Sequence, residues 1–139
     1  MKKSVKRDFT LPQPCEEVWQ ALTNRASLAE WMYPNDFEAR VGHRFTFQVP
    51  PNPKVNFDGL VVHCEVLKCD PPKELAFTWV AGEIDTRVEY RLETSGSGTR
   101  VYFEQNGFEN DQEHARKGAE YGWAHMHGKL TTLLAKESV

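Results

Sequence analysis

The feature that most constrains the fold is an amphipathic stretch from Asn110 to Lys136, the longest helical pattern in the chain. Its apolar and small residues recur in steps of three and four, so they share one face of a helix. That face consists of Ala115, Gly118, Ala119, Gly122, Trp123, Met126, Leu130, Leu133 and Leu134. We expect Asn110 or Asp111 to cap the start of the helix, with Glu113 reaching back. A helix of this length must pack its apolar face against the rest of the domain.

The apolar face of this predicted helix is uneven. Small residues, including Gly118 and Gly122, occupy its first half, and bulky residues follow from Trp123 onward. A glycine inside a helix costs about 1 kcal/mol relative to alanine, so these two require a packing or functional reason. Two interpretations remain open: close packing of the helix backbone on a sheet, or a cavity under the first half.

Length and charge limit what the chain can be. Its 139 residues predict one domain, 1–139, that can bury a core without disulfides or a metal. The net charge of −3 comes from interspersed acidic and basic residues, which argues against a nucleic-acid or membrane-surface partner. The sequence contains no apolar run long enough for a signal peptide or a membrane span. Three cysteines without a Cys-x-x-Cys motif fit a reducing compartment, so we expect a cytoplasmic protein.

Most of the remaining sequence alternates between apolar and polar residues, as half-buried strands do. The first predicted strand runs from Val5 to Leu11, and we expect its inward-facing Arg7 to pair with a carboxylate at the rim of the sheet rather than to contact a ligand. Two short amphipathic helices follow, the second with a capping box that begins at Ser27. Further strands are joined by turns rich in proline and glycine. The pattern predicts an α+β fold: a curved antiparallel sheet of about six or seven strands around the long C-terminal helix.

The candidate catalytic and metal-binding residues do not form a convincing site. His125 and His127 are two positions apart on a helix and point in different directions, unlike the pair of a zinc helix. His63 and Cys64 lie on opposite faces of a strand. An inward-facing Cys64 in apolar surroundings would have a raised pKa and little nucleophilic thiolate. We therefore predict no metal, no cofactor and no catalytic residue.

The inward-facing aromatic residues are the better candidates for a functional site. Together with small helix residues opposite, they suit a pocket with apolar walls and few polar groups, although each is equally suited to a plain core. The polar anchors would be Tyr90, Gln105 or His43. The predicted ligand-binding residues are Trp31, His43, Phe45, Phe47, Phe77, Trp79, Tyr90, Phe103, Gln105, Gly122, Trp123 and Met126.

Several short motifs spread over nearly the whole chain match a known family. They are Trp19 with Leu22, Leu28 to Trp31 with Pro34, Val41-Gly42, Asp70-Pro71-Pro72, Phe77-Thr78-Trp79, Gly98-Thr99-Arg100 and Gly122-Trp123. In these residues the chain resembles the AHSA-type branch of the START-like superfamily, named after the C-terminal domain of the activator of the heat-shock protein 90 ATPase. The resemblance implies the helix-grip fold, with two short helices after the first strand. Gly42-His43 replaces the glycine pair that is common in the family, which puts a histidine at the start of an inward-facing strand.

The resemblance also implies three possible functions. Many members of the superfamily hold a small apolar or aromatic molecule between sheet and helix, which is the function we expect here, for a monomer or a homodimer. A chaperone-cofactor type of protein-interaction module is the alternative, since the activator stimulates a chaperone. A weak cyclase or hydrolase that uses a pocket residue is the third possibility. Fold alone does not decide among them.

Overall fold

The computed structural model describes residues 2–137 of the chain and confirms the predicted architecture. The strands form one antiparallel sheet in the order β1-β6-β5-β4-β3-β2. The strands are β1 (Lys3–Leu11), β2 (Arg44–Val49), β3 (Leu60–Asp70), β4 (Glu74–Ala81), β5 (Ile84–Ser95) and β6 (Gly98–Phe108). The α-helices are α1 (Cys15–Thr23), α2 (Arg25–Trp31) and α3 (Glu113–Glu137), and two short 3-10 helices are η1 (Pro53–Val55) and η2 (Asn110–Gln112).

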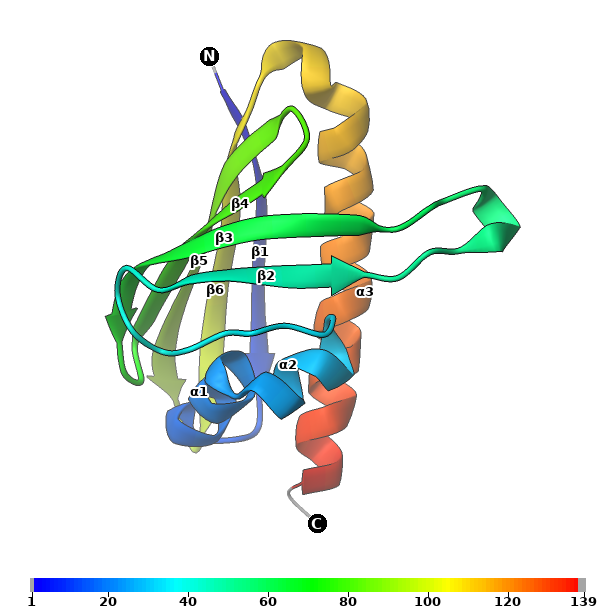
Figure 1. Cartoon of the computed structure of the whole chain (residues 1–139). Helices are drawn as coiled ribbons and strands as arrows, with labels where there is room; N and C mark the ends of the chain where they lie inside the picture. The colour runs from blue at the N-terminus through cyan, green and yellow to red at the C-terminus, as the bar shows by residue number, and fades with distance from the viewer. Residues whose placement is uncertain (1, 138–139) are drawn as a thin grey trace.

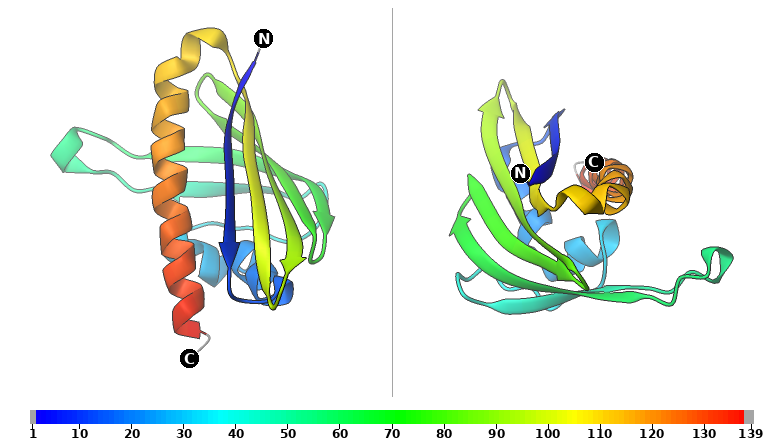
Figure 2. Two further views of the ribbon diagram at one scale, coloured as in Figure 1. Left: turned by 180° about the vertical axis from the view of Figure 1, so that it is seen from behind. Right: turned by 90° about the horizontal axis from the view of Figure 1, so that it is seen from above.

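The sheet curves around α3, as Figure 1 and the view from above in Figure 2 show. The short helices α1 and α2 follow β1 and close one end of the layer between the sheet and α3 (Figure 1). Strand β1 forms the edge of the sheet that lies nearest α3, and it pairs only with β6 among the strands. A half-buried antiparallel sheet must cover its apolar face, and α3 with the two short helices supplies that cover.

The starts of two helices differ from the sequence-based predictions. Glu109 caps the turn before α3, because its side chain and that of Gln112 form the two halves of a capping box. Neither Asn110 nor Asp111 plays this role. Asn24 caps α2 by accepting a hydrogen bond from the backbone N–H of Ser27, so α2 begins before the predicted capping box. Several polar residues compete at each start, and the local sequence does not tell which one the chain will use.

The free edge of β2 is covered by the segment that precedes it. The backbone N–H of Gln48 donates to the carbonyl of Pro34 at 2.9 Å. The backbone N–H of Thr46 donates to a carboxylate oxygen of Asp36 at 2.6 Å. These two bonds occupy donors that an open edge would offer to another strand, so they protect the edge from unwanted pairing.

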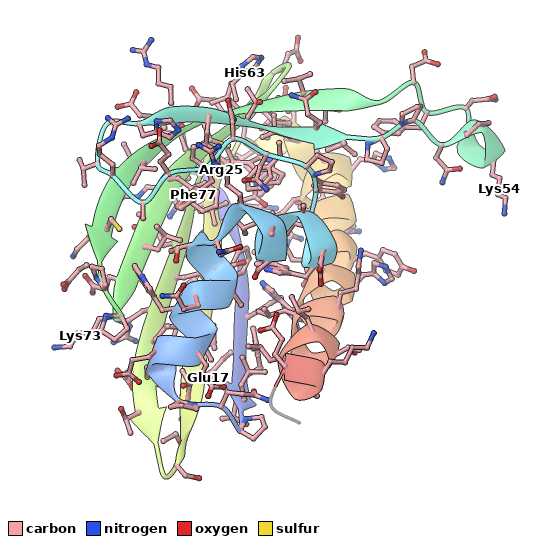
Figure 3. The ribbon with its side chains drawn as sticks, turned by 60° about the horizontal axis from the view of Figure 1, so that its bottom comes forward. Glu17, Arg25, Lys54, His63, Lys73 and Phe77 are labelled. Carbon is pink, nitrogen blue, oxygen red and sulfur yellow. The ribbon has the colours of Figure 1, made fainter. Side chains whose placement is uncertain are left out.

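Between β2 and β3 the chain forms an arm that projects away from the body of the domain (Figure 1). The arm contains η1, and its prolines Pro50, Pro51 and Pro53 carry no backbone N–H donor. An isolated bridge between Asn52 and Phe57 holds its two sides together. Figure 3 shows Lys54 at the tip of the arm, far from Phe77 in the interior, while His63 points outward from β3.

The core lies between the concave face of the sheet and the three α-helices. Alternate residues of the strands point into it, as the buried positions Val88, Tyr90 and Leu92 of β5 illustrate. From α3, the residues Trp123, Met126, His127, Leu130 and Leu134 are buried. All five belong to the second half of the helix, so the core is centred there.

Candidate functional site

The centre of the interior holds a histidine, His127, which is 1% exposed. It follows Trp123 by one helical turn, so both side chains point from α3 toward the sheet. Five aromatic rings of the described residues surround the imidazole, with centroids 4.8 Å (Phe9), 6.1 Å (Trp31), 5.8 Å (Tyr90), 4.8 Å (Phe103) and 5.7 Å (Trp123) away. A polar ring in such surroundings must find hydrogen-bond partners to be tolerated.

Both ring nitrogens of His127 have a partner. The Nε–H of Arg7, on β1, donates to Nδ1 at 2.9 Å. Tyr90, on β5, places its hydroxyl oxygen 2.9 Å from Nε2. Because Nε of arginine can only donate, Nδ1 must be the unprotonated acceptor, and the neutral ring carries its proton on Nε2. His127 therefore donates to Tyr90, and the hydroxyl hydrogen of Tyr90 has no acceptor among the described residues.

Burial and the neighbouring charge of Arg7 keep His127 neutral. Together they lower its pKa to about 3, with burial as the larger cause. Burial likewise raises the pKa of Tyr90 well above the ordinary tyrosine value. The cluster Arg7–His127–Tyr90 thus has one permanent positive charge and two neutral groups at neutral pH.

The prediction that Arg7 pairs with a carboxylate was wrong. Its hydrogen-bond partner is the imidazole of His127, which lies 120 positions away in the sequence. No carboxylate within residues 2–137 forms an ion pair with this guanidinium. The sequence analysis also left His127 out of the candidate site. The signal that could have found it is its spacing of four from Trp123, which gives both residues the same face of the helix.

A second buried polar chain lies next to this cluster. The indole N–H of Trp123 donates to the side-chain carbonyl of Gln105 at 2.7 Å. The amide of Gln105 donates to the hydroxyl of Thr86 at 2.9 Å, and Thr86 donates to the backbone carbonyl of Trp79 at 2.9 Å. Each link has a defined donor and acceptor, so Gln105 ties α3 to the sheet. Thr86 is a further member that the sequence analysis did not include.

The remaining predicted aromatic residues form one continuous group with Trp123. Phe45, Phe47 and Phe77 pack edge-on against one another, with ring centroids between 5.4 and 6.2 Å apart. Trp79 bridges this group to α3, since its ring lies 5.5 Å from Phe47 and 5.1 Å from Trp123. Figure 3 shows Phe77 in the interior between the sheet and the short helices.

Three predicted site residues remain: Trp31, whose ring also lies 6.1 Å from that of His127, Met126 and His43. His43 lies in the loop before β2, where Nε2 contacts the carbonyl of Asp36 at 2.9 Å and Nδ1 lies 3.2 Å from a carboxylate oxygen of Glu38. Trp31 is buried, and its indole N–H donates to the carbonyl of Ala21 at 2.9 Å. Met126 is buried on α3 beside His127. The structure therefore separates His43 from the two polar chains of the interior.

The first half of α3 is much less covered than the second. No residue from Glu113 to Gly122 is buried. A Cβ atom added to Gly118 or Gly122 would meet no atom within 4 Å. Close packing of these glycines on a sheet, one of the two interpretations of the sequence, is therefore wrong.

Half-buried apolar residues lie along the same part of the molecule. On α3 they are Ala115 and Ala119, and on the β4–β5 hairpin they are Trp79, Ala81 and Ile84. A hydrogen bond from the side chain of Gln112 to the carbonyl of Glu83, 3.0 Å long, ties the hairpin to the start of α3. We call this region, from Glu113 to Gly122 with the facing β4–β5 hairpin, the open half of the helix grip.

Chemistry at other positions is limited. Within the described residues, no group of three or more His, Cys, Asp or Glu side chains is arranged to hold a metal ion. Burial, helped by Asp36, raises the pKa of Cys64 and leaves little thiolate. No helix of the described chain is long and apolar enough to cross a bilayer. Among residues 2–137, surface grooves lie on the outer face of the sheet, beside the start of α1, and between α2 and α3.

Comparison with solved structures supports this description of the fold. Protein MLL2253 from Mesorhizobium loti is 34% identical, with a TM-score of 0.86 over 96% of this chain and 98% of that one. Protein CV1439 from Chromobacterium violaceum has a TM-score of 0.81 at 17% identity, over 94% of this chain and 96% of that one. DynU16, from the dynemicin biosynthetic locus, has a TM-score of 0.80 at 20% identity, over 95% of this chain and 47% of that one. No curated protein sequence matches the chain significantly.

The family comparison agrees with the motifs and the topology. The model of the Activator of Hsp90 ATPase homolog 1-like proteins matches residues 12–135, which includes α1, α2, five of the six strands and almost all of α3. Members of this family commonly bind hydrophobic ligands. The helix-grip topology, the solved relative at 34% identity and the family match all agree. The chain therefore belongs to the Activator of Hsp90 ATPase homolog 1-like family.

Proposed function

We propose that the protein binds a small apolar or aromatic molecule against the open half of the helix grip. The observation that carries the proposal is the set of half-buried apolar residues there, together with the half-buried Gly122, where an added Cβ atom would meet nothing within 4 Å. Trp79 and Trp123 would form the floor, because they join this region to the packed core. A ligand that buries about 300 Å² of apolar surface gains on the order of 7 kcal/mol before the cost of association, which corresponds to modest affinity.

Polar selectivity would come from Tyr90. Its hydroxyl accepts from His127, and the hydrogen of this buried hydroxyl has no acceptor among the described residues, so a ligand that reaches it could supply one. Gln105 is a weaker candidate, because Trp123 and Thr86 already occupy its carbonyl and one amide hydrogen. His43 belongs to the loop before β2 and is the weakest of the three predicted anchors.

The first test is native mass spectrometry of protein purified gently from its own cells, with a denatured sample to identify any released molecule. We expect a stoichiometric apolar compound. The variant Gly122→Leu fills the space beside Trp123 and should lose the compound, whereas Gly118→Leu, at an exposed position, should keep it. A compound retained equally by both variants would place binding elsewhere and contradict the proposal.

A protein-interaction role is the second candidate. Large apolar side chains are exposed on the surface at Val41, Leu60, Val61, Leu67 and Tyr121. Leu60 and Val61 lie at the base of the projecting arm, where a partner could reach them (Figure 1). Protein that is free of small molecules, together with a stoichiometric partner that depends on Leu60 and Val61, would favour this role.

Catalysis receives less support. Both nitrogens of His127 are engaged, and its pKa of about 3 makes it a weak general base. The thiol of Cys64 is buried with a raised pKa. These two groups are the interior candidates for acid–base or nucleophilic chemistry, so a binding function fits the described interior better.

A further inference from the structure

We propose that Arg7 binds the carboxylate of the ligand, so that the molecules held by this protein are apolar organic acids. The inference rests on the proposed binding function and specifies its ligand class. It starts from a difference between Arg7 and the other arginines of the chain.

Most arginines of the chain are paired with carboxylates at the surface. The ion pairs are Arg40 with Glu38, Arg44 with Glu65, Arg87 with Glu89, Arg91 with Glu93, Arg100 with Asp8, and Arg116 with Glu113. Arg25, which is exposed, donates to the carbonyl of Phe37 at 2.7 Å. Arg7 is half-buried and has no carboxylate partner among residues 2–137. The arginine that most needs a counter-charge is thus one that has none.

The donors of Arg7 are only partly used. Nε is occupied by His127, and neither terminal nitrogen donates to a described residue. His127 is neutral and compensates no charge. The terminal nitrogens are not among the buried atoms that lack a partner, so they are open to solvent, and an anion there would make charge-assisted hydrogen bonds with them. A carboxylate suits them best, because its two oxygens match the planar fork of a guanidinium.

The surroundings of Arg7 suggest what the carboxylate is attached to. The guanidinium lies 5.6 Å from the centroid of Phe9, which is half-buried. The rings of Trp31, Phe103 and Trp123 that surround His127 are themselves buried. A small inorganic anion would leave the ring of Phe9 and the half-buried apolar residues of the open half unused. An acid with an aromatic or aliphatic body would contact them while its carboxylate meets Arg7.

Access to Arg7 comes from the edge of the sheet. Its strand, β1, is the edge strand that lies beside α3, as the view from behind in Figure 2 shows. Arg7 keeps partial solvent exposure there, although His127 beneath it is buried. A ligand can therefore reach the exposed part of the guanidinium at this edge of the sheet without first unpacking the imidazole.

The test compares acids with neutral molecules of the same shape. We would titrate the protein with 2-naphthoate and 2-naphthamide, and with decanoate and decanamide, and follow the indole N–H signals of the tryptophans by NMR. We expect each acid to bind at least about tenfold more tightly than its amide, since a charge-assisted hydrogen bond contributes on the order of 1.5–3 kcal/mol. Equal affinity of acid and amide would overturn the role of Arg7 while leaving the binding site intact.

Variants separate charge from structure. Arg7→Gln should reduce the preference for the acid to about one, and Arg7→Lys, which keeps the charge, should retain part of it. Arg44→Gln, on the outer face of β2, should change nothing. If neutral naphthalene binds and neither acid does, the anion site at Arg7 is refuted but the apolar binding site is not. Absence of binding by every probe would refute both the anion site and the proposed function.

Discussion

The two halves of α3 perform different tasks although they belong to one continuous helix. From Trp123 onward the helix buries five side chains and forms the centre of the core, where Trp123 packs against Trp79 of β4 and Phe103 of β6. From Glu113 to Gly122 it buries none and carries glycines that face open space. The half with bulky residues, from Trp123 onward, therefore stabilises the fold. The half with small residues contributes no buried side chain to the core, and we propose that it serves to bind a ligand.

The largest effect should come from the packed half. Leu130 is completely buried, so Leu130→Ala should lower the free energy of unfolding by about 2–5 kcal/mol, through lost apolar contact and a new cavity. Urea denaturation followed by tryptophan fluorescence measures it. Leu133→Ala, at a half-buried position on the same helix, should cost clearly less. Equal costs at both positions would contradict the view that burial in this half determines stability.

The polar cluster sharpens the comparison next. Tyr90→Phe removes the acceptor of the His127 N–H and leaves a buried donor without a partner, which should cost about 1–3 kcal/mol of stability. The proposed ligand should also bind more weakly to this variant. Tyr102→Phe is the control, because the Tyr102 hydroxyl reaches only the exposed side chain of Glu93. Unchanged ligand affinity in Tyr90→Phe would remove Tyr90 from the set of anchors.

Acid should weaken the packed half through His127. Its folded-state pKa, about 3, lies below the ordinary value of 6.5, so between these limits the unfolded chain binds the extra proton. The contribution is complete above about pH 6.5 and is lost as the pH falls toward 3, at up to about 1.4 kcal/mol per pH unit. The carboxylates of the chain also make stability depend on pH. The measurement is therefore the urea midpoint of wild type minus that of His127→Gln, followed across this pH range. Parallel pH profiles would show that His127 does not titrate in this way.

The smallest predicted effect belongs to the open half and has the opposite sign. Gly118→Ala and Gly122→Ala should each raise the free energy of unfolding by about 0.5–1 kcal/mol, because alanine favours the helix and its methyl group meets no atom. Thermal unfolding followed by circular dichroism measures both. Destabilisation by either substitution would mean that the first half of α3 is packed after all.

Much of the fold could be predicted because its signals are local. Alternation in β5 and the three-and-four spacing in α3 identify the buried faces, and both predictions were confirmed. Glycine and proline turns separate the strands correctly. The starts of α2 and α3 were less predictable, because neighbouring polar residues compete for the same capping position.

The candidate site could be predicted only in part. An aromatic interior that includes Phe103, Trp79 and Trp123 follows from alternation and helix spacing, and these rings do contact one another. Which polar groups join them did not follow. His43 pairs with the loop before β2, whereas His127, left out of the prediction, lies at the centre.

By itself, the sequence determined the elements, their buried faces and the uneven character of α3, because periodicity acts over a few residues. Only the tertiary structure decided the partners of the interior polar groups. Arg7 and His127 are 120 positions apart, and Tyr90 and His127 are 37 apart. The curvature of the sheet brings these three side chains together, and no local pattern encodes that distance. The same curvature leaves the glycines of α3 facing open space while it buries Leu130 and Leu134.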